Sequence, residues 1–103
     1  MRDLDIRRLL RRHLVSKFGT DPTALIPDEF SICCGKVRAD MAVVNGELKG
    51  FEIKSDQDTL YRLRSQASVY GNIFDTVTIV TGPRHIRKAK KIVPSWWGQA
   101  PPL

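Results

Sequence analysis

The chain has 103 residues, which gives room for one domain with one modest core and excludes a second domain. Its hydrophobic content of 42% and charged content of 27% are ordinary for a globular protein, and they exclude a disordered chain. Seventeen Lys and Arg against eleven Asp and Glu give a net charge of +6, which favours polyanionic partners. No apolar run approaches the roughly 20 residues that span a bilayer, and the Arg-rich start lacks a secretory signal, so we expect a cytoplasmic protein without membrane contact.

The first predicted element is an amphipathic helix over Asp3–Phe18. Ile6, Leu10 and Leu14 recur at helical spacing along it, and Gly19 is expected to end it. A loop with two prolines follows, and a short strand is predicted over 30–34. Its last two residues, Cys33 and Cys34, are adjacent, so we expect two free thiols rather than a disulfide or a zinc site.

Strands over Val37–Val44 and 48–55 are predicted to pair across Asn45-Gly46, a strong hairpin signal. A second helix is predicted from an N-cap at Asp58 to about Phe74, followed by a strand over 76–80. Gly82-Pro83 is expected to open a third helix that Pro94 stops, and residues 99–103 are expected to form a loose tail.

This order, α-β-β-β-α-β-α, predicts a single α/β domain over residues 1–103. A β-α-β crossover after an antiparallel meander gives a mixed four-stranded sheet flanked by helices. Trp96 and Trp97 are expected to cover an end of the core or a subunit surface rather than to stack on bases.

The predicted hairpin carries a candidate site. Glu52 and Lys54 are two residues apart on a strand and share a face, whereas Ile53 points into the core. A strict two-residue turn would pair Asp40 with Phe51 and place its carboxylate on the wrong face. A site that includes Asp40 therefore requires a three-residue loop or a bulge, with Gly46 in the left-handed conformation.

Two converging carboxylates repel each other, and such a pair is commonly kept by a divalent cation. Asp40, Glu52 and the Ile53 carbonyl are expected to hold Mg²⁺ or Mn²⁺, and Lys54 to position the attacking water beside a phosphodiester. The alternative is a solvated Glu-x-Lys on a strand face, since this short string is common by chance.

The stretch from Glu52 to Gln66, with Tyr70 after it, reads EIKSDxDTLxRLxxQxxxY and resembles the PD-(D/E)XK nuclease superfamily. It is most similar to a small bacterial and phage branch, over roughly residues 25–82. The resemblance implies a restriction-endonuclease-like fold, metal ligands at Asp40 and Glu52, and a catalytic lysine at Lys54. It further implies supporting roles for Gln66 and Tyr70, and a further metal ligand at Glu29 for which an exposed loop acid is an equal alternative.

These observations lead to the prediction of a Mg²⁺-dependent endonuclease-like phosphodiesterase that hydrolyses DNA in a bacterial or phage-infected cell. The alternatives are an RNA nuclease of the same fold, and a non-catalytic module that binds nucleic acid or protein. DNA is expected before RNA as the partner, and the small footprint of one domain leaves a homodimer open. The predicted phosphate contacts are Arg62, Arg64, Arg84, Arg87 and Lys88.

Overall fold

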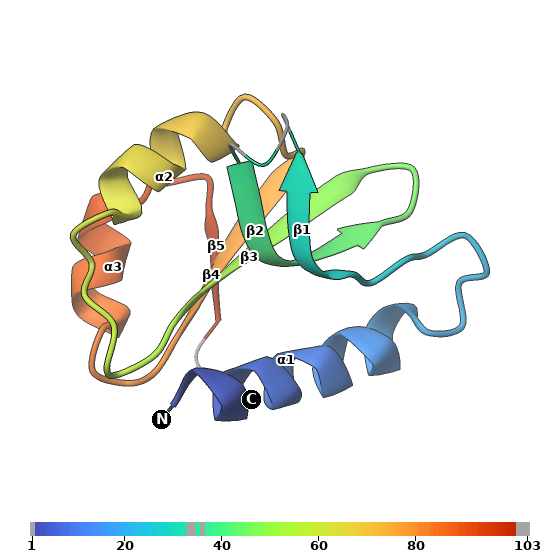
Figure 1. The fold of residues 1–103 in the computed structure, drawn as a ribbon, viewed down its shortest axis with the longest axis horizontal. Helices are drawn as coiled ribbons and strands as arrows, with labels where there is room; N and C mark the ends of the chain where they lie inside the picture. The colour runs from blue at the N-terminus through green and yellow to red at the C-terminus, as the bar shows by residue number, and fades with distance from the viewer. Residues whose placement is uncertain (1, 33–34, 36, 101–103) are drawn as a thin grey trace.

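The computed structural model describes residues 2–32, 35 and 37–100 (Figure 1). The elements in chain order are α1 (Asp3–Phe18), β1 (Asp28–Ile32), β2 (Val37–Val44), β3 (Leu48–Lys54), α2 (Leu63–Tyr70), β4 (Thr76–Thr81), α3 (Ile86–Ile92) and β5 (Gly98–Ala100). The predicted α/β class and the order of the first seven elements are confirmed. The prediction about Cys33 and Cys34 lies outside the described residues.

The strands form one mixed sheet in the order β1-β2-β3-β4-β5. The first three strands are antiparallel neighbours, whereas β4 runs parallel to β3 and β5 runs parallel to β4. The short β5 adds a fifth strand to the four that were predicted. It also corrects the predicted loose tail, because Gln99 and Ala100 pair with Ile79 and Val80 of β4.

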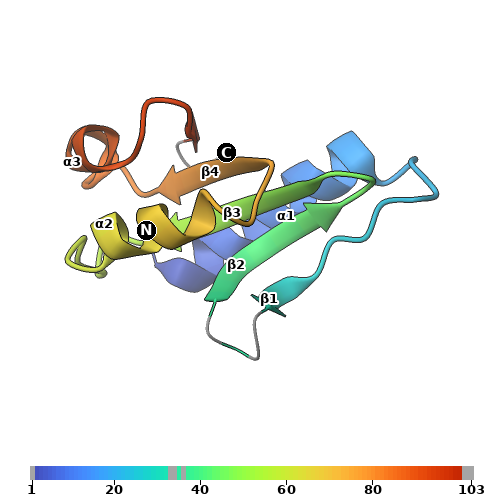
Figure 2. The same cartoon turned by 90° about the horizontal axis from the view of Figure 1, so that it is seen from above.

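The sheet separates two apolar clusters (Figures 1 and 2). On one face Ile6, Leu10 and Leu14 of α1 pack with residues that include Ile53 and Val80. On the other face α2 and α3 pack together on the sheet, and the cluster there contains Leu63, Ala67, Tyr70, Ala89 and Val77, among others. The orientation predicted for Ile53, into the core and away from Glu52, is confirmed.

The β2–β3 hairpin has the register that the candidate site requires. Met41 pairs with Phe51 and Val44 pairs with Leu48, so the loop has three residues, Asn45 to Glu47. Gly46 has a φ of +90°, in the left-handed region that favours glycine. The three-residue loop is therefore confirmed, and it sets Asp40 and Glu52 one position beyond the last pair of the ladder.

The second helix starts later than predicted. Asp58 is not its N-cap, because its Oδ2 atom accepts hydrogen bonds from the backbone N–H and the hydroxyl of Ser55, at 2.8 and 3.1 Å. The aspartate thus closes a turn after β3, and α2 begins at Leu63. The helix also ends at Tyr70, before Phe74. Likewise α3 begins at Ile86 rather than at Gly82-Pro83.

Trp97 is buried, and its ring stacks on Tyr70 with centroids 6.1 Å apart. The neighbouring Trp96 is half exposed. Trp97 therefore covers one end of the core, as predicted for this pair. No described helix has both the length and the apolar composition needed to cross a membrane.

Candidate functional site

Glu52 is buried on the α2 side of the sheet, where α2 supplies two of its hydrogen-bond donors. The Gln66 amide nitrogen donates to Oε1 at 3.2 Å, and the Tyr70 hydroxyl lies 2.9 Å from Oε2. Gln66 and Tyr70 are four residues apart, so both side chains leave α2 on the same face. The Lys54 ammonium group lies 3.6 Å from Oε1, and its side chain is only 11% exposed.

Asp40 is held where β2 and β3 diverge. Its Oδ2 atom accepts the backbone N–H of Ile53 at 2.8 Å, and its Oδ1 atom lies 3.3 Å from the Arg7 guanidinium. Arg7 also donates to the Asp40 carbonyl at 3.0 Å. Asp40 therefore connects α1 to the end of the central hairpin.

The Tyr70 hydroxyl lies between two acceptors, the Arg38 carbonyl at 2.6 Å and Glu52 Oε2 at 2.9 Å. A phenol has one hydrogen to donate. When that hydrogen goes to the Arg38 carbonyl, the contact with Glu52 requires a proton on the carboxyl group. When the hydrogen goes to Glu52 instead, it stabilises the carboxylate form.

Burial and the neighbouring charges favour the protonated form of Glu52. Burial, assisted by the negative charge of Asp40, raises the pKa of Glu52 to about 7. Burial also raises the pKa of Asp40, although the Ile53 N–H and Arg7 oppose this shift. Burial next to Glu52 raises the pKa of Tyr70, which keeps the phenol protonated.

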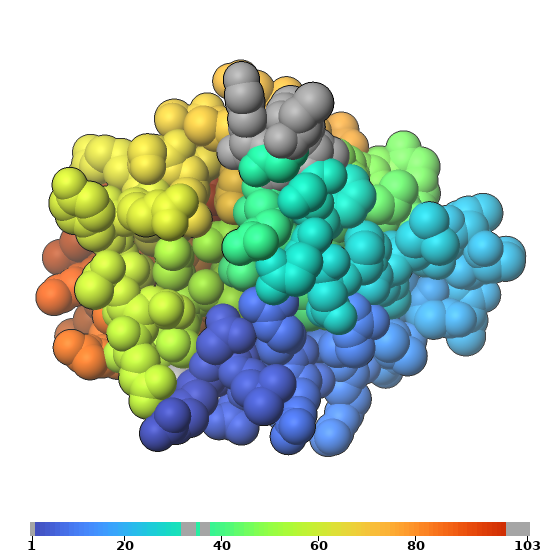
Figure 3. Space-filling view, in the orientation of Figure 1, coloured from blue at the N-terminus to red at the C-terminus, as the bar shows by residue number. Residues whose placement is uncertain are grey.

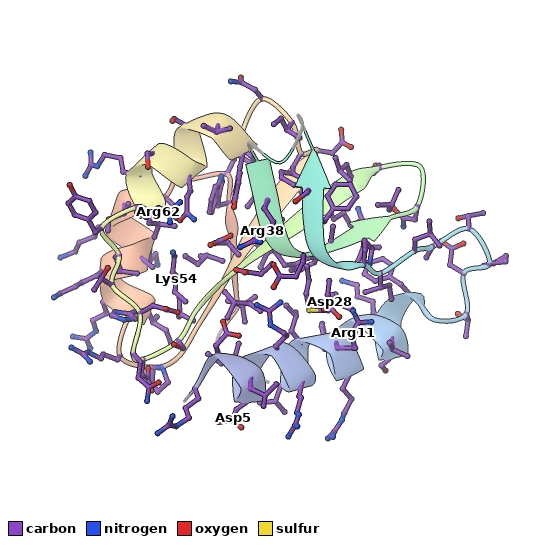
Figure 4. The ribbon with its side chains drawn as sticks, viewed as in Figure 1. Asp5, Arg11, Asp28, Arg38, Lys54 and Arg62 are labelled. Atoms are coloured by element: carbon purple, nitrogen blue, oxygen red, sulfur yellow. The ribbon has the colours of Figure 1, made fainter. Side chains whose placement is uncertain are left out.

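Both carboxylates line a polar pocket of about 550 Å³, together with Arg38, Arg62 and Gln66, among others. The pocket lies between α2, yellow in Figure 3, and the green surface of β2. Figure 4 shows Arg38, Lys54 and Arg62 around this region, each on a different segment of the chain. The structure thus gathers Asp40, Glu52, Lys54, Gln66 and Tyr70, while the role of each stays a prediction.

The predicted metal site has a limited donor set. Among the described residues, no group of three or more His, Cys, Asp or Glu side chains could hold a metal ion. Glu29 pairs instead with Arg7 at 3.4 Å and with Arg38 at 3.2 Å, and it is half exposed. Its φ is +51°. Asp40 and Glu52 fit Mg²⁺ poorly, since both carboxylates already accept hydrogen bonds from the protein. The binding of Mg²⁺ or Mn²⁺ by Asp40, Glu52 and the Ile53 carbonyl stays a prediction.

The five predicted phosphate contacts lie on the surface of the α2 and α3 side. Arg62 lines the pocket, and Arg64 is exposed on α2. Arg87 and Lys88 are exposed on α3. Arg84 is exposed just before α3, and its Nη1 atom donates a hydrogen bond to the Asp56 carbonyl at 2.9 Å.

Two arginines at this site were not predicted from the sequence. Arg38 is two residues before Asp40 on the same strand, so the alternation of strand side chains could have found it. Arg7 carried no such signal, because its contact with Asp40 joins residues 33 positions apart. In the sequence Arg7 looks like the other arginines of α1, and only the packing of that helix on the sheet distinguishes it.

These features define a basic α/β domain with a polar pocket whose floor holds two carboxylates and whose edge holds arginines. The family described as Bacteriophage P4 protein cII matches residues 2–98, and the chain belongs to this family. The chain is 37% identical over 95 residues to a protein titled "Protein cII" from Enterobacteria phage P4. That match covers 92% of this chain and 36% of the relative, so the chain spans about a third of the relative's length. No solved structure matches the chain.

The family assignment corrects the resemblance to PD-(D/E)XK nucleases. The predictions of a nuclease, a hydrolase and a Mg²⁺-dependent phosphodiesterase are wrong, because nearly the whole chain matches the phage P4 cII family instead. The motif that suggested a nuclease involves only a few positions. In the structure, these positions form a network of internal hydrogen bonds. The expected phage origin agrees with the family.

Proposed function

We propose that the protein is a non-catalytic nucleic-acid-binding module that contacts the phosphate backbone through a basic surface on α3, with DNA as the expected polymer. One observation carries this proposal. Residues 76–103 contain five Lys or Arg and no Asp or Glu, whereas residues 1–75 contain 12 Lys or Arg against 11 Asp or Glu. Nearly all of the net positive charge therefore belongs to one segment of the fold.

We call this surface the α3 basic face, and it consists of Arg84, Arg87, Lys88, Lys90 and Lys91. All five side chains are exposed, while Ala89 anchors the helix in the core. Among the described residues, no ion pair involves Arg87, Lys88, Lys90 or Lys91, so these cations are available to a polyanion. Phosphate contacts of this kind release counterions and supply most of the sequence-independent affinity.

The cations of α1 are the natural comparison. Arg7 pairs with three acids, Asp3, Glu29 and Asp40, and Arg11 pairs with Asp28 at 2.9 Å (Figure 4). Part of the positive charge of α1 is therefore neutralised inside the protein. The α3 basic face supports binding better than α1 because of this difference in pairing.

Charge reversal tests the proposal. Fluorescence anisotropy with labelled 20-nucleotide DNA and RNA, single- and double-stranded, would give the affinity of the wild type and of Arg87→Glu/Lys88→Glu/Lys91→Glu. We expect this variant to bind at least about thirtyfold more weakly and to lower the salt slope by about 3, one unit for each lost phosphate contact.

The matched control is Arg8→Glu/Arg12→Glu/Lys17→Glu on α1, which changes the net charge by the same amount at exposed positions. We expect it to keep most of the affinity. An equal loss in both variants would show that binding depends on overall charge and not on α3. A wild-type protein that binds none of the four nucleic acids at 50 mM salt would overturn the proposed function.

A further inference from the structure

A second hollow lies on the face of the sheet opposite to the polar pocket, beside α1. Helices α2 and α3 pack on the pocket side, whereas α1 packs on this face (Figure 1). The start of β4 stays accessible next to α1, since Thr76 is exposed and Thr78 is only partly buried. The hollow has a volume of about 600 Å³, within the range of roughly 300 to 1,000 Å³ that is usual for small-molecule sites. We call it the α1 groove, and its accessible wall includes His13, Lys17, Phe18, Lys49, Phe51 and Trp96.

The α1 groove presents aromatic surface to solvent. Phe18 and Phe51 pack against the apolar cluster under α1 but are only partly buried, and Trp96 is 50% exposed. Leu10 and Leu14 lie behind these rings and are almost fully buried, so they support the wall without being reached by a guest. An apolar group in the groove would remove the exposed ring surfaces from water, which is favourable. One part of the matching guest is therefore a hydrocarbon body.

The charged groups of the α1 groove are all basic. His13 and Lys17 are exposed, line the groove and stand one turn apart on α1. The Lys17 ammonium group lies 5.6 Å from the centroid of the Phe18 ring, at the wall of the groove. Within the part of the chain that the structure describes, no carboxylate pairs with either side chain and no Asp or Glu lines the groove. Lys49 also lines it but pairs with Glu47 at 2.7 Å, so Lys17 and His13 are the groups left for a negative charge.

We infer that the α1 groove binds a small amphipathic organic anion, with its acidic group at Lys17 and His13 and its hydrocarbon body against Phe51 and Trp96. A nucleotide fits less well, because it would place the polar edge of its base against these apolar walls. The inference goes beyond the proposed nucleic-acid binding and does not depend on it. None of the residues of the α3 basic face lines the groove.

Three simple amphiphiles test the inference with the unaltered protein: decanoate, hexanoate and decyltrimethylammonium. Calorimetric titration gives the affinity and the stoichiometry, and tryptophan fluorescence reports on the surroundings of the half-exposed Trp96. We expect decanoate to bind one to one and to shift the emission to shorter wavelength, because its chain replaces water beside the indole ring. Hexanoate has four fewer methylene groups and should bind at least about tenfold more weakly. Decyltrimethylammonium has the same chain with the opposite charge and should not bind.

The variant Lys17→Glu places a negative charge at the rim of the groove, and we expect it to weaken decanoate binding at least about tenfold. Arg12→Glu is the matched control, because Arg12 is exposed on the same helix but does not line the groove. It changes the net charge by the same amount and should keep the affinity within about twofold. Thermal unfolding checks that both variants fold. If Lys17→Glu does not fold, the three amphiphiles with the wild type still decide the matter.

Several results would overturn the inference. Absence of decanoate binding, or equal binding of decanoate and decyltrimethylammonium, would show that the groove does not select an amphipathic anion. A shift of the Trp96 emission by oligothymidine but not by decanoate would mean that the groove takes a nucleobase instead. Undiminished decanoate binding by folded Lys17→Glu would contradict the role given to Lys17. Each of these results leaves the proposed function standing, because the charge-reversal test on the α3 basic face uses other residues and other ligands.

Discussion

The charge of Glu52 depends strongly on the fold. Its pKa is raised to about 7 from an ordinary value of 4.5, so between these pH values the folded protein binds a proton that the unfolded chain does not. Stability therefore falls as pH rises through this window and levels off above about pH 7.

We expect Glu52→Gln to reduce the difference in unfolding free energy between pH 5 and pH 8 by up to about 3 kcal/mol, since each pKa unit corresponds to about 1.4 kcal/mol. Urea unfolding at both pH values measures this difference. Glu47→Gln, at an exposed site, should leave it unchanged. A Glu52→Gln protein with the pH profile of the wild type would show that another group, such as Asp40, causes the dependence.

The second prediction at the residue scale concerns the contribution of the Tyr70 hydroxyl to stability. Tyr70→Phe removes the group that joins the Arg38 carbonyl to Glu52, and it leaves both without this partner. We expect a loss of about 1 to 3 kcal/mol in the free energy of unfolding at pH 7. Tyr61→Phe is the control, because Tyr61 is almost fully exposed, and it should change stability by less than about 0.5 kcal/mol.

At the scale of elements, β3 approaches the segment after α2 closely at Gly50. A Cβ atom at this position would lie 2.9 Å from the Phe74 ring, which is itself buried in the core. We expect Gly50→Ala to lower the free energy of unfolding by about 1 to 3 kcal/mol through overpacking.

Gly71→Ala tests whether the effect at Gly50 comes from packing. Gly71 has a helical φ of −61°, and a Cβ atom there would meet nothing closer than 3.4 Å. We expect Gly71→Ala to be neutral or slightly stabilising. Equal losses in the two variants, measured by urea unfolding, would contradict the packing explanation.

The whole molecule has a net charge of +6, and residues 76–103 contribute five of these positive charges. If the α3 basic face makes four or five phosphate contacts, the logarithm of the binding constant for duplex DNA should fall with the logarithm of salt concentration with a slope of about −4. Anisotropy titrations between 50 and 300 mM NaCl measure this slope. A slope near zero, with binding retained, would mean that phosphate contacts do not dominate.

Much of the architecture was predictable because local signals determine it. The spacing of Ile6, Leu10 and Leu14 defines α1, and Asn45-Gly46 with its alternating flanks defines the hairpin. The start of α2 was not predictable, because Asp58 has the residue type of a helix cap but binds back to Ser55. The strand β5 was missed because its pairing with β4 involves residues about 20 positions away.

The sequence alone determined the order of the first seven elements, the face of β3 on which Glu52 lies and the concentration of basic residues in residues 76–103. These properties depend on local spacing, strand alternation and composition. Only the tertiary structure decided that Arg7 reaches Asp40, that Tyr70 lies between two acceptors and that the Gln66 oxygen has no partner among the described residues. These contacts join residues far apart in the chain, and burial then sets the charge of Glu52, so no local pattern could reveal them.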